Sequence, residues 1–398
     1  MSSSPPRRPI TVLQIIPTLV TGGAERTTID IAAALAARGD RALVASEGGR
    51  LLLDELRSVG GEFVRMPVAG KNPVSLLVNA RRIAALIEGE RVDIVHARSR
   101  APAWSSLIAA RRTSVPLVTT YHGIYGETNP LKRFYNSVMV RGAAVIANSR
   151  ATAQLIRARY GTAPEAITII PRGTDLGRFD VEAVDPVRRN LVRQSWGIDR
   201  EKRIVLNLAR LTGWKGQRVL IDAATSPPLS QRGDVAIVLA GDAQGRDDYR
   251  RELETLIEAR GQSGRIRIVG HVEDAPAAYA LADVAVVAST EPEGFGRTAV
   301  EAAAMGLPVV ATRLGATEET VLAPPAVTDA ERTGWLVVPG DAAALSAAID
   351  AALSLSEEDR AGLAERARRH AGNFATEAMQ RATLDLYDRL LSRTRNGG

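Results

Sequence analysis

The feature that most constrains this chain is a regular alternation of short β-rich runs with alanine-rich helical stretches. In the first half, apolar runs predict strands at 10–16, 41–45, 62–66, 92–96, 116–120, 143–147 and 166–170. Helical stretches separate them, among them 25–38, 73–88 and 101–112. Because consecutive parallel strands need a crossover segment between them, this alternation predicts a doubly wound parallel sheet with helices on its faces.

The alternation pauses between residues 171 and 200, which are rich in proline, glycine and polar residues, and then resumes. Further strands are expected at 203–209, 235–240, 265–269, 284–288, 308–312 and 335–338, and helices at 215–225, 246–260, 275–281, 297–305, 341–353 and 357–371. A chain of 398 residues exceeds one core. We expect two α/β domains, 1–185 and 186–375. A C-terminal helix in 376–398 could fold against either domain, including back on the first.

Composition excludes several classes of protein. Hydrophobic residues make up 45% and charged residues 24% of the chain, which is typical of a soluble globular protein. The absence of cysteine excludes disulfides, thiolate catalysis and cysteine zinc sites, and fits a cytoplasmic location. The four histidines lack metal-ligand spacing, so no metal site is expected. The apolar run near the N-terminus contains polar residues and Pro17, which favours a first strand over a signal peptide, and no run is long enough for a transmembrane helix.

The first expected strand ends in a loop that contains Gly22 and Gly23 and leads into a helix. Adjacent glycines allow the backbone to approach a ligand closely, and the amides at a helix N-terminus attract anions. The loop lacks the spacing of a dinucleotide fingerprint. It therefore predicts an anion site, and an ordinary strand-to-helix turn is the alternative.

The densest signal lies between Glu293 and Glu301, after a buried strand of the second half. Gly294 and Gly296 place Glu293 on a loop, and a helix is expected to start near Thr298, with Glu301 in its first turns. Carboxylates accept hydrogen bonds from sugar hydroxyls, and helix N-terminal amides bind phosphate. The segment predicts a site for a polyhydroxylated anion. The alternative is a surface acid and a second acid that stabilises the helix dipole.

Three further residues follow expected strands, where ligands bind in open parallel sheets. Arg210 and Lys215 lie at a strand end and a helix start, where two cations could neutralise a diphosphate. His122 precedes Gly123 at another strand end. A substrate contact and a structural histidine are equally consistent with that position.

Taken together, these segments resemble the family-4 retaining glycosyltransferases of the GT-B fold, in which two Rossmann-like domains face each other across a cleft. The likeness covers nearly the whole chain and includes bacterial transferases of lipopolysaccharide core and surface glycans. It rests on Gly22-Gly23-Ala24-Glu25, Asn148-Ser149, Arg210, Lys215-Gly216, Gly241-Asp242, Glu293-Gly294-Phe295-Gly296 and Glu301. The most specific element is the pair of glutamates with seven residues between them.

The resemblance implies a role for each matching residue. Gly23 would place an amide near the donor phosphate, and Arg210 and Lys215 would bind the diphosphate and support the leaving nucleoside diphosphate. Glu301 would bind the ribose hydroxyls. Such enzymes need no cofactor beyond the donor, a UDP- or GDP-linked sugar, and no metal, since the two cations replace it.

The resemblance also assigns the donor sugar. Glu293 and the amides of Phe295 and Gly296 would hold its hydroxyls, and His122 would lie beside the anomeric carbon. The expected catalytic residues are therefore His122, Arg210, Lys215 and Glu293. The remaining donor-binding residues are Gly22, Gly23, Gly241, Gly294, Phe295, Gly296, Thr298 and Glu301. One departure is Arg172, where many relatives carry asparagine, and it puts acceptor assignments from that loop in doubt.

Other functions remain alternatives. A nucleotide-sugar epimerase, an inverting transferase or a non-catalytic nucleotide-sugar-binding protein could share the fold. Nucleic-acid binding is not expected, because the chain shows no recognition helix and only 4% aromatic residues.

Charge is distributed unevenly along the chain. Residues 1–180 contain 24 Lys and Arg against 14 Asp and Glu, and the remainder contains 27 against 31. Within 98–141, the only acid is Glu127, and the cations are Arg98, Arg100, Arg111, Arg112, Lys132, Arg133 and Arg141. Aromatic residues interleave with them. This stretch predicts a peripheral enzyme on the inner face of the plasma membrane with a lipid-linked acceptor. The alternative is a soluble acceptor and a solvated arginine-rich surface.

Overall fold

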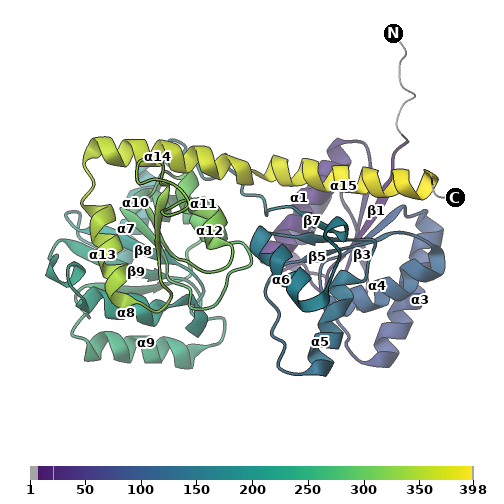
Figure 1. Ribbon diagram of the computed structural model, residues 1–398, viewed down its shortest axis with the longest axis horizontal. Helices are drawn as coiled ribbons and strands as arrows, with labels where there is room; N and C mark the ends of the chain where they lie inside the picture. Colours follow the sequence, from purple (N-terminus) through teal and green to yellow (C-terminus); the bar gives the residue numbers. More distant parts are fainter. Residues whose placement is uncertain (1–7, 21, 397–398) are drawn as a thin grey trace, which may run out of the picture. The chain divides into compact units, whose positions relative to one another are not determined.

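The computed structural model describes residues 8–20 and 22–396. The chain forms two compact units, one of Met1–Gly173 with Thr376–Gly398 and one of Thr174–Ala375 (Figure 1). The division after Gly173 precedes the boundary expected at residue 185. Helix α7 (Pro186–Trp196), in the segment expected to be a linker, packs on α10 (Ala275–Leu281) of the second unit.

The first unit is built on a seven-stranded parallel sheet with the order β3-β2-β1-β4-β5-β6-β7. Its strands are β1 (Thr11–Ile15), β2 (Arg41–Ser46), β3 (Glu62–Arg65), β4 (Ile94–Ala97), β5 (Leu117–Tyr121), β6 (Ala144–Ala147) and β7 (Ile167–Ile169). Its α-helices are α1 (Gly23–Ala37), α2 (Arg50–Ser58), α3 (Pro73–Glu90), α4 (Arg100–Thr113), α5 (Pro130–Asn136), α6 (Arg150–Tyr160) and α15 (Thr376–Asn396).

The second unit is built on a six-stranded parallel sheet with the order β10-β9-β8-β11-β12-β13. Its strands are β8 (Arg203–Leu208), β9 (Val235–Ala240), β10 (Ile266–Gly270), β11 (Val284–Val287), β12 (Val309–Thr312) and β13 (Gly334–Val337). Besides α7 and α10, its α-helices are α8 (Gln217–Thr225), α9 (Asp247–Ala259), α11 (Arg297–Ala304), α12 (Thr317–Thr320), α13 (Ala342–Leu353) and α14 (Glu357–Ala371). The predicted fold class, two Rossmann-like units with parallel sheets, is confirmed.

Local chemistry explains where these elements begin. The central strands are continuous apolar runs because both faces of a parallel sheet are covered by helices. Asn72 caps α3 through the amide of Ser75, and Pro73 occupies the first helical position, where its missing N–H is not needed. Ser356 caps α14, which has acids in its first turn and basic residues in its last, as the helix dipole favours.

The C-terminal helix α15 completes the core of the first unit. Met379, Leu386 and Tyr387 are buried in one cluster with Val12 of β1 and Ile29 of α1. The helix also makes polar contacts in this core, because the Tyr387 hydroxyl lies 2.6 Å from Nδ1 of His96. The first unit is thus assembled from the two ends of the chain.

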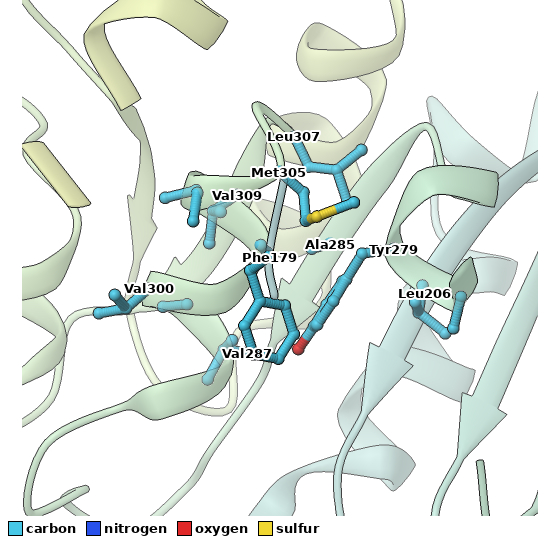
Figure 2. Packing of buried hydrophobic residues seen from close by; sticks show 14 of the residues in the cluster. Phe179, Leu206, Tyr279, Ala285, Val287, Val300, Met305, Leu307 and Val309 are labelled. Carbon is cyan, nitrogen blue, oxygen red and sulfur yellow. The ribbon is translucent and has the colours of Figure 1, made fainter. Parts of the chain in front are cut away.

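The core of the second unit lies on both faces of its sheet, and Figure 2 shows one of these clusters. Phe179, which precedes α7, packs edge-on against Tyr279 of α10 with ring centroids 6.1 Å apart. Their neighbours include Val287, Val300 and Met305. The cluster fixes α11 against the sheet, and α11 carries part of the candidate site.

In both sheets the strand order reverses beside the first strand of the unit, between β1 and β4 and between β8 and β11. Ligands of open α/β sheets bind beyond the carboxyl ends of the strands at such points. Among the described helices, none is both long and apolar enough to cross a membrane.

Candidate active site

The segment that follows β8 turns back toward the end of β11. Gly216 has a φ of +71° and a Cβ at this position would lie 1.8 Å from the carbonyl oxygen of Ala288. Only glycine permits this approach. As a result Lys215, on the turn Gly213–Lys215 before α8, is brought beside the loop that follows β11.

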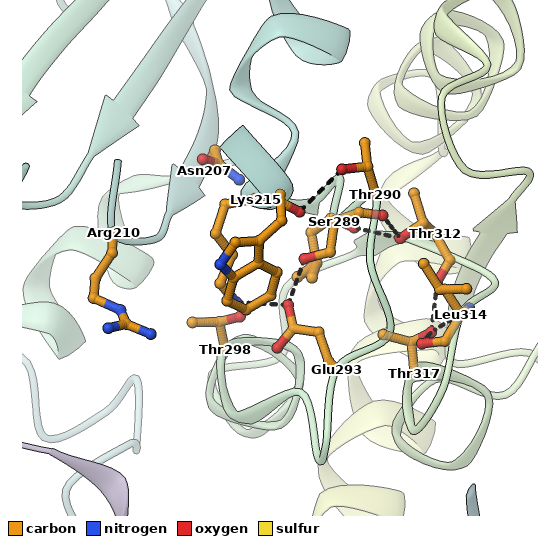
Figure 3. Close-up of polar contacts among 12 residues, drawn as sticks. Asn207, Arg210, Lys215, Ser289, Thr290, Glu293, Thr298, Thr312, Leu314 and Thr317 are labelled. Carbon is orange, nitrogen blue, oxygen red and sulfur yellow. Dashed lines mark hydrogen bonds and ion pairs between the residues drawn. The ribbon is translucent and has the colours of Figure 1, made fainter. Parts of the chain in front are cut away.

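Lys215, Glu293 and Ser289 form a buried polar cluster (Figure 3). Nζ of Lys215 lies 2.6 Å from Oε1 of Glu293, and the Ser289 hydroxyl donates to the same oxygen at 2.5 Å. The side chains of Lys215 and Glu293 are only 11% and 9% exposed. The ring of Trp214 lies 4.3 Å from the ammonium group. A buried carboxylate and a buried cation thus stabilise each other at the end of β11.

The backbone of Glu293 is held from the neighbouring strand. The amide of Ala316 donates to the Glu293 carbonyl at 3.1 Å, and Gly315 forms an isolated bridge with Glu293. Gly315 has a φ of +67°, and a Cβ there would lie 2.7 Å from the Glu293 oxygen. The sequence interpretation missed both Ser289 and Gly315. The only signal for Gly315 is its position after the predicted strand 308–312.

Glu301 lies in the second turn of α11, which begins at Arg297 after Gly296. Its carboxylate lies 3.3 Å from Nε of Arg297 and 3.4 Å from the Tyr279 hydroxyl, and it is 8% exposed. Burial raises the pKa of Glu301, and Arg297 and Tyr279 oppose this shift. Gly296 adopts a φ of +81° before the helix, which glycine does without strain.

The remaining residues expected at the donor site lie around this helix start. Phe295 is buried in the core, and Gly294 and Thr298 are partly exposed. Figure 3 shows Thr298 beside the Lys215–Glu293 pair. Phe295 and Gly296 directly precede α11, whose start at Arg297 lies beside the start expected near Thr298.

Arg210 and Gly241 follow β8 and β9. Arg210 is exposed and lies 3.4 Å from Gln244, with no dashed contact to Lys215 in Figure 3. A Cβ on Gly241 would lie 1.9 Å from the carbonyl oxygen of Ala209, so this glycine allows the two strand ends to approach each other. The two predicted cations therefore differ: Lys215 is paired with an acid, whereas Arg210 extends into solvent.

In the first unit, Gly22 precedes α1 and Gly23 is its first residue. The predicted loop also includes Thr21, which lies outside the described residues. His122 follows β5, and its carbonyl oxygen accepts a hydrogen bond from Asn148 at 3.1 Å. The side chain of Arg172 lies 3.1 Å from Nδ1 of His122. Burial, followed by the charges of Arg172 and Arg98, lowers the pKa of His122 well below 6.5.

His96 is a structural residue. Its two ring nitrogens lie 2.6 Å from the Tyr387 hydroxyl and 2.7 Å from the Thr120 hydroxyl, in a fully buried environment. Arg98 is also buried, and its guanidinium donates to the side-chain oxygen of Gln14 on β1. No cluster of three or more potential metal ligands occurs among the residues that the structure describes.

Comparison with known proteins shows the family. Residues 21–178 match the model of Glycosyltransferase Family 4, and residues 188–370 match that of Glycosyl transferases group 1. A D-inositol 3-phosphate glycosyltransferase of Xylanimonas cellulosilytica is 30% identical over 74% of this chain and 71% of its own. The chain belongs to glycosyltransferase family 4.

Two further comparisons concern proteins whose names or bound ligands indicate their substrates. The lipopolysaccharide core biosynthesis mannosyltransferase LpsB of Rhizobium meliloti is 33% identical over 62% of this chain and 66% of its own. The solved structure of Anabaena Alr3699/HepE in complex with UDP-glucose has a TM-score of 0.77 and 27% identity, and covers 98% of this chain and 100% of that one. As a family-4 member, the protein is a glycosyltransferase.

Proposed function

We propose that this glycosyltransferase moves a hexosyl group from a nucleoside diphosphate sugar to a glycan or glycolipid acceptor with retention of configuration. The observation that carries the proposal is the buried Lys215–Glu293 pair, which lies at the end of β11 just before α11. The carboxylate can accept from sugar hydroxyls and the ammonium can bind phosphate. The UDP-glucose complex of HepE supports a donor of this class.

The donor's diphosphate would bind to Lys215 and Arg210. Lys215 is held in position by Glu293, so its orientation is set before the donor arrives. Arg210 is exposed and can turn its planar fork onto a phosphate. Glu301 would accept hydrogen bonds from the ribose hydroxyls, and its buried position makes such bonds strong.

In the transfer, the bond between the anomeric carbon and the phosphate oxygen breaks, and the acceptor hydroxyl forms a new bond to that carbon. The hydroxyl proton passes to an oxygen of the leaving diphosphate, so no further co-reactant is needed. Negative charge grows on the leaving phosphate, where Lys215 would stabilise it more in the transition state than in the ground state. The two cations supply the charge that a divalent metal would otherwise provide, and we propose a metal-independent reaction.

The test is incubation of the protein with UDP- and GDP-linked sugars, with and without a panel of glycan and lipid-linked acceptors. A transferase consumes the donor only with an acceptor and yields a product with the donor's anomeric configuration, read by NMR. Interconversion of the donor alone would identify an epimerase instead, an inverted product an inverting transferase, and an intact donor a binding protein.

For the acceptor, we propose a lipid-linked molecule at an anionic membrane surface. The patch in question, the α5 patch, consists of exposed apolar and basic side chains: Leu131, Phe134, Arg111, Arg112, Lys132, Arg133 and Arg141. Leu131 is 81% and Phe134 is 57% exposed. The Arg141 guanidinium lies 5.0 Å from the Phe134 ring, and Arg141 and Arg111 line one surface hollow. Apolar side chains beside cations suit an anionic bilayer surface.

Two of the seven cations predicted for this surface do not belong to it. Arg98 is 3% exposed and bonds to Gln14, so its inclusion was wrong. Arg100 is partly buried against the Tyr125 ring at 4.3 Å and donates to Asn136. The sequence could not distinguish these two arginines from the exposed ones, because their burial depends on tertiary packing and not on residue type.

Vesicle binding tests the α5 patch. We expect binding to phosphatidylglycerol vesicles but not to phosphatidylcholine vesicles, with a decrease as salt rises, because exposed charges are screened over about 8–10 Å. Leu131→Ser with Phe134→Ser should abolish binding. Val187→Ser with Leu191→Ser, which alter apolar residues of α7 that are also more than half exposed, should leave it unchanged. Absence of binding at low salt would contradict the membrane proposal and leave the transferase proposal intact.

A further inference from the structure

Arg172, named above as one departure from the family resemblance, lies against His122. It follows β7, and its Nη2 atom lies 3.1 Å from Nδ1 and 3.0 Å from the carbonyl oxygen of His122. One guanidinium therefore contacts both the ring and the backbone of the same histidine. The carbonyl oxygen also accepts from Asn148, so the histidine is held from β6 and from β7.

The chemistry of this contact determines the state of the ring. A guanidinium has five N–H donors and no acceptor, so Nδ1 of His122 must be the acceptor. An imidazole whose Nδ1 accepts a hydrogen bond carries its single proton on Nε2. The ring is also neutral, because it is buried among Arg172, Arg98 and His96, with the Tyr125 hydroxyl at its backbone.

Nε2 of His122 is buried and has no hydrogen-bond partner among residues 8–20 and 22–396. Buried polar atoms are nearly always paired in native proteins, and an exception calls for a missing ligand or water. Since His122 follows the carboxyl end of β5, where substrates of parallel sheets bind, a substrate oxygen is the matching partner.

We propose that Arg172 is a positioning residue that holds His122 as the neutral Nε2–H tautomer, so that the ring donates a hydrogen bond to a substrate oxygen. The oxygen belongs to a hydroxyl or a phosphate, both of which accept from N–H. A ring in this state carries no free lone pair toward the substrate and cannot act as the general base. This inference rests on the proposed transferase function only for the identity of the substrate.

The state of the ring can be measured without any substrate. The ligand-free protein is labelled with ¹⁵N-histidine, and His122 is assigned with His122→Gln. We expect the spectrum of the wild type to show a protonated Nε2 and an unprotonated Nδ1, unchanged from pH 8 to pH 5.5. Arg172→Met removes the donor while keeping side-chain length. It should give mixed tautomers, a His122 pKa nearer its ordinary value, and a kcat/KM reduced about tenfold, the value of one hydrogen bond.

Two variants make the test specific. Arg172→Lys keeps a donor and a charge, and should restore the Nε2–H tautomer. Arg157→Met removes an exposed arginine of α6 and should change neither the spectrum nor the rate. A wild-type ring that carries its proton on Nδ1, or that titrates near pH 6.5, would overturn the inference. The expected spectrum in a protein that consumes no donor would instead overturn the proposed function alone.

Discussion

Charged side chains are paired differently at the carboxyl ends of the two sheets. In the second unit, each buried acid of the candidate site has a cationic partner: Glu293 with Lys215, and Glu301 with Arg297. In the first unit, Arg172 and Arg98 lie near a neutral imidazole, and no acid contributes to the shift in the pKa of His122. In the second unit these two acids are paired with cations before ligand binds, whereas in the first unit the charges that lower the pKa of the imidazole include those of two arginines.

This difference between the two units indicates that their sites bind different parts of the substrates. Where a cation is already paired with a carboxylate, it can also contact the phosphate of a diphosphate sugar with little change in its position. The buried N–H donor that we propose for His122 favours an electron-rich oxygen. Four predictions follow the contrast, from the largest effect to the smallest.

Lys215→Ala should remove the cation that is paired with Glu293 in the second unit. We expect kcat to fall about 10²–10³-fold, the usual loss for one group that stabilises developing charge. The variant also leaves the Glu293 carboxylate without its cation, so thermal unfolding is measured in parallel. The exposed Lys71→Ala is the control. Near-normal kcat in a folded Lys215→Ala protein would remove this residue from the mechanism.

Glu301→Gln should weaken donor binding while making the free protein more stable. Loss of a charged acceptor predicts an affinity roughly 10–100-fold lower, measured by calorimetry. Burial raises the pKa of Glu301, so its contribution to stability is present at low pH and is lost as pH rises through the folded-state pKa. At neutral pH the ionised group therefore lowers stability, and the Tm of the variant should rise. Unchanged donor affinity would contradict the ribose role; Glu291→Gln is the matched control.

The pH dependence of donor binding should separate the two sites. Because the pKa of Glu301 is raised, protonation of this carboxylate should weaken donor binding at a higher pH than protonation of an ordinary glutamate would. In Glu301→Gln this decrease in affinity at acid pH should disappear. The pKa of His122 is lowered well below 6.5, so it should contribute no change between pH 8 and pH 6.5. A change in donor affinity near pH 6.5 that disappears in His122→Gln would show that His122 titrates in this range, and would contradict the difference between the two sites.

Chelation should have the smallest effect. Lys215 and Arg210 can carry the charge on the donor's diphosphate, so EDTA should leave the initial rate unchanged. The rate is measured with and without added Mg²⁺ or Mn²⁺. If EDTA abolished activity and either ion restored it, Lys215 and Arg210 would not be sufficient to neutralise the donor's diphosphate, and the reaction would need a metal.

The sequence predicted the elements well because periodicity and turn residues are local signals. Every strand expected from an apolar run is present within a few residues, and helix α14 has the expected bounds of 357–371. It also placed Lys215 and Glu293 in the right loops. Strand order brings these segments together, since β8 and β11 are neighbours although strands β9 and β10 and helices α8, α9 and α10 lie between them in the chain.

The partners of the site residues were not predictable in the same way. Nothing local marks Ser289 as the donor to Glu293, or Tyr279 as a neighbour of Glu301, because each pair joins different elements or opposite ends of a loop. The burial of Arg98 was missed for the same reason. Arg172 was noticed only as a departure from the family, and its contact with His122 required the relative positions of β5 and β7.

The place of α15 in the first unit has a consequence for the order of events during synthesis. The 202 residues of Thr174–Ala375 are translated between Gly173 and the helix that covers its core. At about 5–20 residues per second, the ribosome needs roughly 10–40 seconds to add them. Throughout that interval the apolar face around Val12 and Ile29, and the ring of His96, lack Met379 and Tyr387. The first unit to be translated is therefore the last to be completed, and its apolar face stays uncovered while the second unit is made.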